Sequence, residues 1–209
     1  MMAIFLVLDV TTLIYSILFG YYPRISLFDA TCYRILYIHV PLAWNMYFAF
    51  TLTFAFSLAY IIRRDERFDC IAFCSAVLGI LYGIGAIVSG MLWAKEVWGS
   101  YWSWDPRQTT TLTALLAYMG YLALRSSIPE IDRARNVSSV FGTSAYITIP
   151  LSFVSAVTFR SLHTQIPQQP LGFEAHILLA LRVATSFALF LSFVRLYYDR
   201  VRKKVINQT

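Results

Sequence analysis

Six long runs of apolar residues dominate this sequence, and they limit its fold more than any other feature. A helix that spans the hydrocarbon core of a bilayer needs about 20 mostly apolar residues. The qualifying runs lie at about 2–20, 35–62, 70–94, 109–124, 137–157 and 176–198. The sequence therefore predicts an all-α fold: a single domain over residues 1–209, built as a polytopic integral membrane bundle of six transmembrane helices.

The composition argues against a soluble protein. Of the 209 residues, 58% are apolar and 13% are charged, whereas soluble domains have about 45–50% and about 25%. The net charge of +6 would raise nucleic acid as a partner in a soluble chain. Here the basic residues lie mainly at the ends of the apolar runs, where Lys and Arg act as topology signals. We therefore expect membrane lipid, and no nucleic acid, around the chain.

The positions of Lys and Arg predict the orientation. An even number of spans puts both termini on one side, and that side carries most of the basic residues: Arg63, Arg64, Arg67, Arg125, Arg133, Arg135, Arg195, Arg200, Arg202, Lys203 and Lys204. The other side carries Arg24, Arg34, Lys95, Arg107 and Arg160. Because cytoplasmic connections hold the excess of Lys and Arg, both termini are predicted to be cytoplasmic. The connections 21–34, 95–108 and 158–175 then face outward.

The segment Trp98–Asp105 is the most unusual part of the predicted outer face. It holds three of the five tryptophans, and Tyr101 makes four aromatic residues within seven positions. One interpretation is an interfacial aromatic belt, because Trp and Tyr favour that depth. The density within one connection favours a second interpretation, a flat apolar platform for a flat ligand.

Asp105 lies at the start of the fourth predicted helix. The order Asp105, Pro106, Arg107, Gln108 is typical of an N-terminus, with Asp at N-cap, Pro at the first helical position and Gln at the third. A carboxylate there also complements the helix dipole. We predict a capping role, which is compatible with a role beside a ligand, because the cap would fix the angle at which the tryptophans leave the helix.

The only histidines, His39, His163 and His176, all fall on the predicted outer side. Imidazole is a common axial ligand of haem iron, and two imidazoles from different connections would clamp a flat macrocycle. Haem also carries two propionate carboxylates, and the outer cations that suit them are Arg34, Lys95, Arg107 and Arg160. The sequence has no Cys-x-x-Cys-His site and no phosphate-binding Gly-x-x-x-x-Gly-Lys loop. The chain is therefore not itself a c-type cytochrome, and any ATP must be hydrolysed by a partner.

These motifs resemble those of a known family. The stretch Trp-Gly-Ser-Tyr-Trp-Ser-Trp-Asp-Pro-Arg-Gln-Thr, residues 98–109, resembles the tryptophan-rich (WWD) signature of haem-handling proteins in cytochrome c biogenesis. Residues 34–44 resemble the segment with that family's first histidine, and residues 160–163 the segment with its second. The chain is similar throughout to the cytochrome c maturation protein C (CcmC) family.

The resemblance implies a role, a cofactor and a site. It implies that the connection 95–108 handles non-covalent haem b on the outer side of the inner (cytoplasmic) membrane. The implied axial ligands are His39 and His163, with His176 a weaker candidate for the second. The implied platform is Trp98, Trp102, Trp104 and Asp105, and Arg34 and Arg107 would assist at the propionates. No bond-making enzyme activity is implied.

The resemblance also implies partners. Haem would pass to a membrane-anchored haem chaperone (CcmE-like). An ABC transporter ATPase with its membrane subunit (CcmA/CcmB-like) and a small single-helix subunit (CcmD-like) would complete the complex. Two alternatives from the residues remain: a membrane b-type cytochrome or quinol redox protein, and a transporter permease subunit.

Two charged residues, Asp9 and Arg182, lie inside predicted spans, where charge is costly. Counted from opposite sides of a core of roughly 30 Å, at 1.5 Å per residue, they differ in depth by about 10 Å. We therefore predict that they do not pair, and that Glu174 or bound haem is the partner of Arg182. The third run carries Gly79 and Gly83, then Ala86 and Gly90, at four-residue spacings typical of close helix packing.

Overall fold

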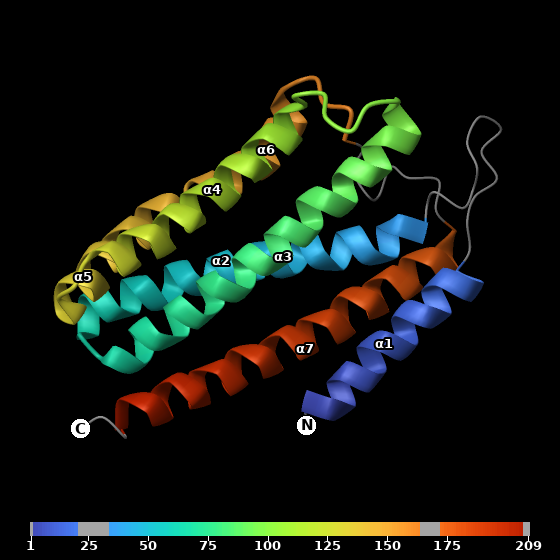
Figure 1. Cartoon of the computed structure of the whole chain (residues 1–209). Helices are drawn as coiled ribbons and strands as arrows, with labels where there is room; N and C mark the ends of the chain where they lie inside the picture. Colours follow the sequence, from blue (N-terminus) through green and yellow to red (C-terminus); the bar gives the residue numbers. More distant parts are fainter. Residues whose placement is uncertain (1, 21–33, 164–171, 207–209) are drawn as a thin grey trace.

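The structure, a computed structural model, describes residues 2–20, 34–163 and 172–206, the last six as backbone only. The described chain forms one helical bundle (Figure 1). Its helices are α1 (Met2–Phe19), α2 (Leu36–Arg63), α3 (Glu66–Trp98), α4 (Pro106–Ser127), α5 (Ile131–Ala145), α6 (Thr148–Thr158) and α7 (Phe173–Ile206). The predicted outer connection 21–34 lies outside the described residues except for Arg34, as do residues 164–171 of the third outer connection.

The predicted all-α membrane fold is confirmed. Within the described ranges, α1, α2, α3, the α5–α6 unit and α7 are long and apolar enough to cross a membrane. Helix α4 is more polar because its first half carries several threonines. Two of their hydroxyls bond to α6, where Thr110 Oγ1 is 3.0 Å from Ser155 Oγ and Thr111 Oγ1 is 3.1 Å from Ser152 Oγ. Hydrogen bonds between helices therefore satisfy these two hydroxyls within the bundle.

The fifth predicted helix is interrupted. The sequence predicted one helix over 137–157, but the structure has α5 ending at Ala145 and α6 beginning at Thr148. Pro150, in the first turn of α6, explains the break, because proline has no N–H to donate to the Tyr146 carbonyl four residues earlier. The Ile149 N–H donates to that carbonyl instead, at 2.9 Å.

Helix α2 lies at the centre of the bundle and packs most closely on α3 (Figure 1). The Phe50 ring of α2 stacks on the Tyr118 ring of α4, with centroids 3.8 Å apart. Glycines of α3 allow α2 and α4 to approach. A Cβ on Gly79 would lie 2.7 Å from the Phe50 ring, and one on Gly83 would lie 2.8 Å from Leu115. The predicted packing role is therefore confirmed for these two glycines.

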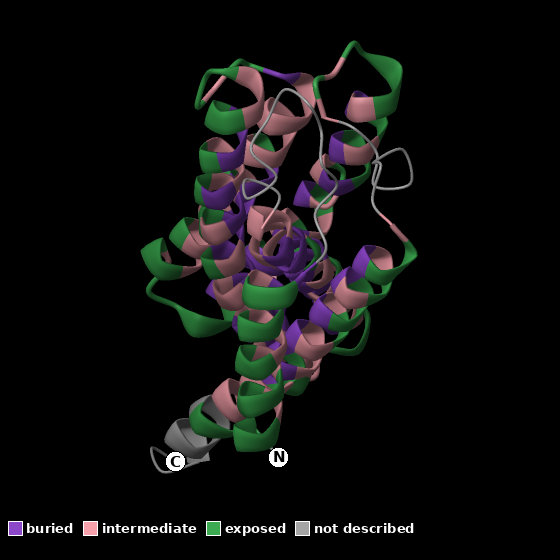
Figure 2. Cartoon of the chain, turned by 90° about the vertical axis from the view of Figure 1, so that its right-hand side faces the viewer, coloured by how far each residue is buried: buried purple, intermediate pink, exposed green. Residues whose placement is uncertain are grey.

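Helix α1 lies at the edge of the bundle, against α7, with most of its surface exposed (Figure 2). Its main polar contact corrects a prediction. Asp9 and Arg182 do form an ion pair, with Arg182 Nη1 2.7 Å from Asp9 Oδ1. The prediction was wrong because it counted depth from opposite ends of the two helices. Counted from the end that α1 and α7 share, Asp9 is ten residues before Phe19 and Arg182 nine residues after Phe173.

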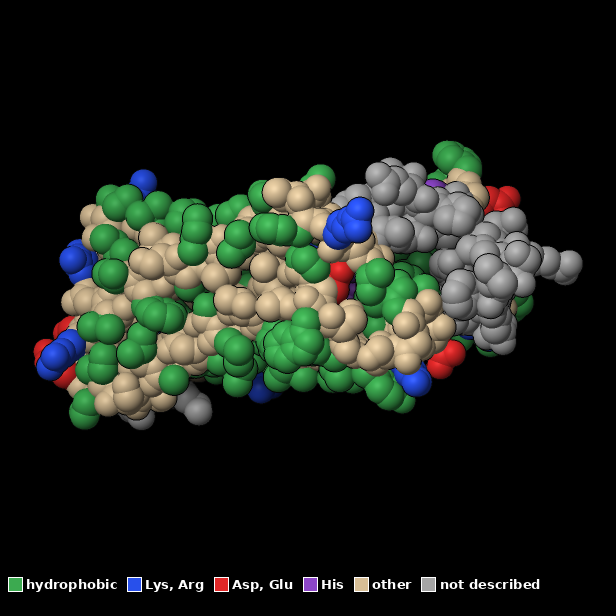
Figure 3. Space-filling view, turned by 90° about the horizontal axis from the view of Figure 1, so that it is seen from above, with side chains coloured by type: hydrophobic (Ala, Val, Ile, Leu, Met, Phe, Trp, Pro, Cys, Tyr) green, Lys and Arg blue, Asp and Glu red, His purple; other side chains and the backbone are tan. Residues whose placement is uncertain are grey.

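Charged side chains in view gather mainly towards the two ends of the bundle, with apolar side chains along its length (Figure 3). At the end opposite the tryptophan segment, a buried Asp69 accepts two hydrogen bonds from Arg125, at 2.5 and 2.6 Å. Arg135 of α5 is 3.5 Å from the same carboxylate. This cluster joins α3, α4 and α5, so that end is fixed independently of the tryptophan end.

Candidate functional site

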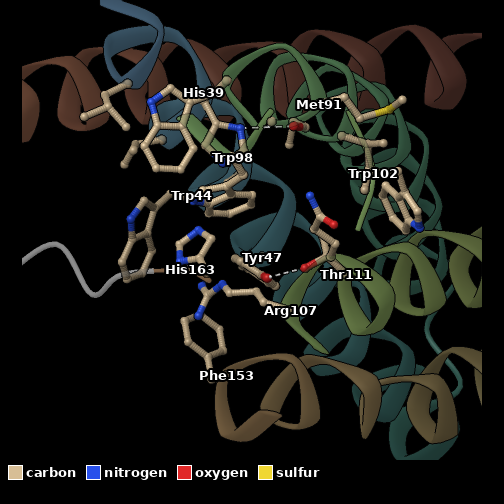
Figure 4. Close-up of a pocket in the computed structure, with 18 of the residues that line it drawn as sticks. His39, Trp44, Tyr47, Met91, Trp98, Trp102, Arg107, Thr111, Phe153 and His163 are labelled. Carbon is tan, nitrogen blue, oxygen red and sulfur yellow. Dashed lines mark hydrogen bonds between the residues drawn. The ribbon is translucent and has the colours of Figure 1, made fainter. Parts of the chain in front are cut away.

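A cavity of about 250 Å³ lies where α3 ends and α4 begins, and it opens between α2, α3, α4 and α6. Its walls are mainly aromatic and apolar, with a few polar groups (Figure 4). Five of the predicted site residues line it: His39, Trp98, Trp102, Arg107 and His163. These residues come from α2, α3, the connection after α3, α4 and the connection after α6, so the fold brings distant parts of the sequence to one place.

His39 is held in one orientation by α3. Its Nδ1 atom lies 3.0 Å from the Ala86 carbonyl and 3.1 Å from Ser89 Oγ. A carbonyl only accepts hydrogen bonds, so Nδ1 carries the proton and Nε2 keeps its lone pair. When one ring nitrogen of a histidine binds a metal, a hydrogen bond from the other ring nitrogen usually orients the imidazole.

Gly90 of α3 provides the space for this imidazole. A Cβ there would lie 2.9 Å from His39 Cε1 and 3.3 Å from Nδ1. From the sequence we predicted a helix-packing role for Gly90, as for the other glycines of α3. In the structure its neighbour is a side chain of the site.

Asp105 is the predicted helix cap, and the structure confirms it. Its Oδ1 accepts from the Arg107 N–H at 2.9 Å, and Pro106 is the first residue of α4. The carboxylate does more than cap. Oδ1 also accepts from Ser161 Oγ at 3.0 Å, and Oδ2 accepts from the Leu162 N–H at 2.6 Å. Asp105 therefore ties the start of α4 to the segment that carries His163.

The side chain of Asp105 is 4% exposed and does not line the cavity. Its hydrogen bonds extend to the second predicted histidine through Ser161, whose Oγ accepts from the His163 N–H at 3.1 Å. One carboxylate thus fixes the angle of α4 and the position of residues 161–163.

The tryptophans of the signature do not share one surface. Helix α3 continues to Trp98, and Gly99, with φ of +78°, ends it in the left-handed conformation that glycine adopts readily. Trp98 and Trp102 line the cavity. Trp104 is 72% exposed and does not line it, although its ring is edge-on to Trp102 with centroids 5.7 Å apart.

Two further tryptophans, Trp44 and Trp93, line the cavity and were not assigned to it from the sequence. Trp93 is buried and meets Trp98 edge-on, with centroids 5.3 Å apart. Trp44 follows His39 by five residues, and α2 also presents Val40, Ala43 and Tyr47 to the cavity. Ala43 and Tyr47 follow His39 by four and eight residues, and Trp44 follows Val40 by four, so helical periodicity accounts for this face of α2.

The predicted cations and the third histidine are placed differently. The guanidinium of Arg107 lies over the Phe153 ring, 4.9 Å from its centroid, beside His163 (Figure 4). Arg34 lies in the short turn before α2 and does not line the cavity. His176 lies in the first turn of α7, with Nδ1 3.0 Å from the Gly172 carbonyl, and is not a lining residue.

This arrangement defines a class of protein: a multi-helix membrane protein with an aromatic cleft that offers two imidazoles and a guanidinium. Such a cleft suits a flat, apolar ligand with an anionic edge and an electrophilic centre. The CcmC family, described as "Heme exporter protein C", matches residues 1–209. The chain belongs to this family, as its sequence motifs predicted.

Individual relatives agree with this assignment. "Heme exporter protein C" of Bradyrhizobium diazoefficiens is 29% identical over 178 residues, or 84% of this chain and 67% of the relative. The protein of the same name from Rhodobacter capsulatus is 30% identical over 170 residues, 80% and 70% of the two chains. A cytochrome c biosynthesis ccmC-like mitochondrial protein of Marchantia polymorpha is 26% identical over 174 residues, 83% and 74%.

Proposed function

We propose that this protein binds haem b non-covalently in the cavity, with His39 and His163 as axial ligands of the iron. The observation that carries the proposal is the setting of His39. Its Nδ1–H is bound to the Ala86 carbonyl, which leaves the Nε2 lone pair for a metal. His163 lines the same cavity and supplies a second imidazole.

The other lining residues fit the same ligand. Trp44, Trp98 and Trp102 provide flat apolar surface for a macrocycle. Arg107 is a cation in the same cavity, and a guanidinium can bind a propionate through two hydrogen bonds. When bound, haem supplies an iron centre with two axial positions, while the protein's own residues orient the macrocycle and exclude water from its faces.

The role of this binding is haem handling in cytochrome c biogenesis, in keeping with the names of the relatives. The protein would hold haem on the extracytoplasmic side of the inner membrane and deliver it to a membrane-anchored chaperone, without making covalent bonds itself. An ABC-type ATPase, its membrane subunit and a small single-helix protein would act with it. The position of the cavity at one end of the bundle supports a site close to one membrane surface.

The test is the visible spectrum of the protein purified from haem-sufficient cells. We expect about one haem per chain with a low-spin, bis-histidine spectrum, and a changed spectrum in both His39→Ala and His163→Ala. Added imidazole should restore the low-spin spectrum in either variant by occupying the vacated position. A wild-type protein that never carries haem would overturn the proposal, and two haems per chain with reversible reduction by quinol would favour a redox protein.

A further inference from the structure

The first turns of α2 contain a local defect beside His39. Pro41 lies inside this helix. In a regular helix the N–H of residue 41 would donate to the carbonyl of residue 37, four positions earlier, but proline has no N–H. His39 lies midway between Tyr37 and Pro41, so the missing hydrogen bond belongs to the turn that positions the proposed haem ligand.

A side chain from α7 supplies the donor that Pro41 lacks. Arg182 Nε donates to the Tyr37 carbonyl at 3.3 Å, and the whole residue is 4% exposed. A buried arginine inside a membrane span is costly unless its charge is paired. Here Arg182 Nη1 forms an ion pair with the carboxylate of Asp9 in α1, and the same nitrogen donates to the Asp9 carbonyl at 2.8 Å.

Hydroxyls complete this cluster. Thr12 Oγ1 of α1 accepts from Arg182 Nη1 at 3.1 Å, and Thr185 Oγ1 of α7 donates to Asp9 Oδ1 at 3.3 Å. Three helices thus meet at one charged group: α1 through Asp9, α7 through Arg182 and α2 through the Tyr37 carbonyl. We call Asp9, Arg182 and the Tyr37 carbonyl the α2 brace.

We propose that the α2 brace positions His39. The turn that carries this histidine is held on two sides: α3 binds the imidazole through Ala86, and α7 binds the backbone two residues earlier through Arg182. Without the brace, the Tyr37 carbonyl would lose this donor inside the membrane, and the turn would relax at the residues around Pro41. Arg182 and Asp9 are positioning residues, because they act on the ligand through α2 and do not line the cavity.

An effect of the α2 brace on haem binding rests on the proposed function, and the test therefore also uses haem-free protein. The variant Asp9→Asn with Arg182→Met removes both charges together, so no unpaired charge remains. We expect His39 in the haem-free variant to react faster with diethylpyrocarbonate, measured by mass spectrometry. In the haem-loaded variant we expect the affinity to fall by about 10–100-fold, the usual effect of losing a group that orients a metal ligand, with a spectrum like that of His39→Ala.

The third substitution, Pro41→Ala, separates positioning from general destabilisation. Alanine restores the N–H that donates to the Tyr37 carbonyl, so it should return both His39 reactivity and the low-spin spectrum towards wild type when added to the charge-free variant. The matched control, Asp69→Asn with Arg125→Met, removes the buried ion pair at the opposite end of the bundle. It should lower thermal stability without changing either His39 signal.

Three results would overturn the α2 brace. They are wild-type His39 reactivity in the Asp9→Asn, Arg182→Met variant, no restoration by Pro41→Ala, or the same His39 changes in the Asp69→Asn, Arg125→Met control. Failure of the proposed function looks different. If the wild type never binds haem, His39 reactivity in the haem-free proteins still decides whether the brace positions this residue.

Discussion

The two histidines of the cavity are held in different ways. His39 is part of a continuous helix, and α3 fixes its imidazole through the Ala86 carbonyl and the space at Gly90. His163 is in a connection, and hydrogen bonds that lead to one carboxylate, Asp105, hold the segment around it. A helix in a packed bundle resists displacement more than a connection does. We therefore expect His163 to be displaced before His39 when a bound ligand leaves.

The largest effect that tests this comparison should come from Asp105→Ser. Serine is also a good N-cap, so α4 should still begin at residue 106, but its hydroxyl is too short to hold Ser161 and Leu162 as well. We expect the rate of haem loss to excess apomyoglobin to rise by about 10–100-fold, and the spectrum to resemble that of His163→Ala, with recovery in imidazole.

The matched control for this substitution is Asp65→Ser. Asp65 caps α3 at the other end of the bundle, where its carboxylate accepts from the Arg67 N–H at 2.9 Å. This variant should keep the wild-type rate of haem loss. If Asp105→Ser also keeps it, the carboxylate does not hold the His163 segment. If haem loss is fast but imidazole gives no recovery, Asp105 acts on the macrocycle and not through His163.

A smaller effect on the His39 side should come from Gly90→Ala. The added methyl would meet the imidazole at 2.9 Å, so the imidazole or α3 would have to shift, and the hydrogen bond of Nδ1 to the Ala86 carbonyl opposes a shift of the imidazole. Overpacking of this kind costs about 1–3 kcal/mol, and a cost near the lower end of this range, about 1.4 kcal/mol, corresponds to tenfold weaker haem binding if it falls on the ligand. Gly85→Ala is the control, because its methyl would meet only the end of Leu42, at 3.2 Å. Equal haem affinities in the two variants would show that Gly90 does not set the position of His39.

The comparison also explains which parts of the site can be predicted from sequence. Asp105 as a cap is a local property, because the cap, the proline and the accepted N–H lie within three residues. Its hold on Leu162 joins positions 57 residues apart and depends on how α4 and α6 pack. The prediction that Asp9 and Arg182 do not pair was wrong for the same reason. Pairing depends on the relative height of two helices, which their spacing in the sequence does not give.

Other features could have been predicted from the sequence by considering proline positions and helical spacing. The break between α5 and α6 follows from Pro150, which removes a hydrogen bond wherever it falls inside an apolar run. Trp44 follows Val40, another lining residue of α2, by four residues, which is ordinary helical spacing. Trp104 is the converse case, because it belongs to the signature by sequence but its side chain is exposed and does not line the cavity. Motif membership identifies the segment, while backbone conformation decides which of its side chains enter the site.

The smallest effect should come from His176→Ala, which tests whether the second ligand has been assigned to the correct connection. His176 is held in the first turn of α7, where its Nδ1 lies 3.0 Å from the Gly172 carbonyl, and it does not line the cavity. We expect the haem spectrum and the rate of haem loss to stay within about twofold of wild type, since surface substitutions outside a site usually change free energies by less than 0.5 kcal/mol. A spectrum like that of His163→Ala would contradict this. It would mean that the ligand opposite His39 lies on a helix, and the contrast between a helix-held and a carboxylate-held histidine would then fail.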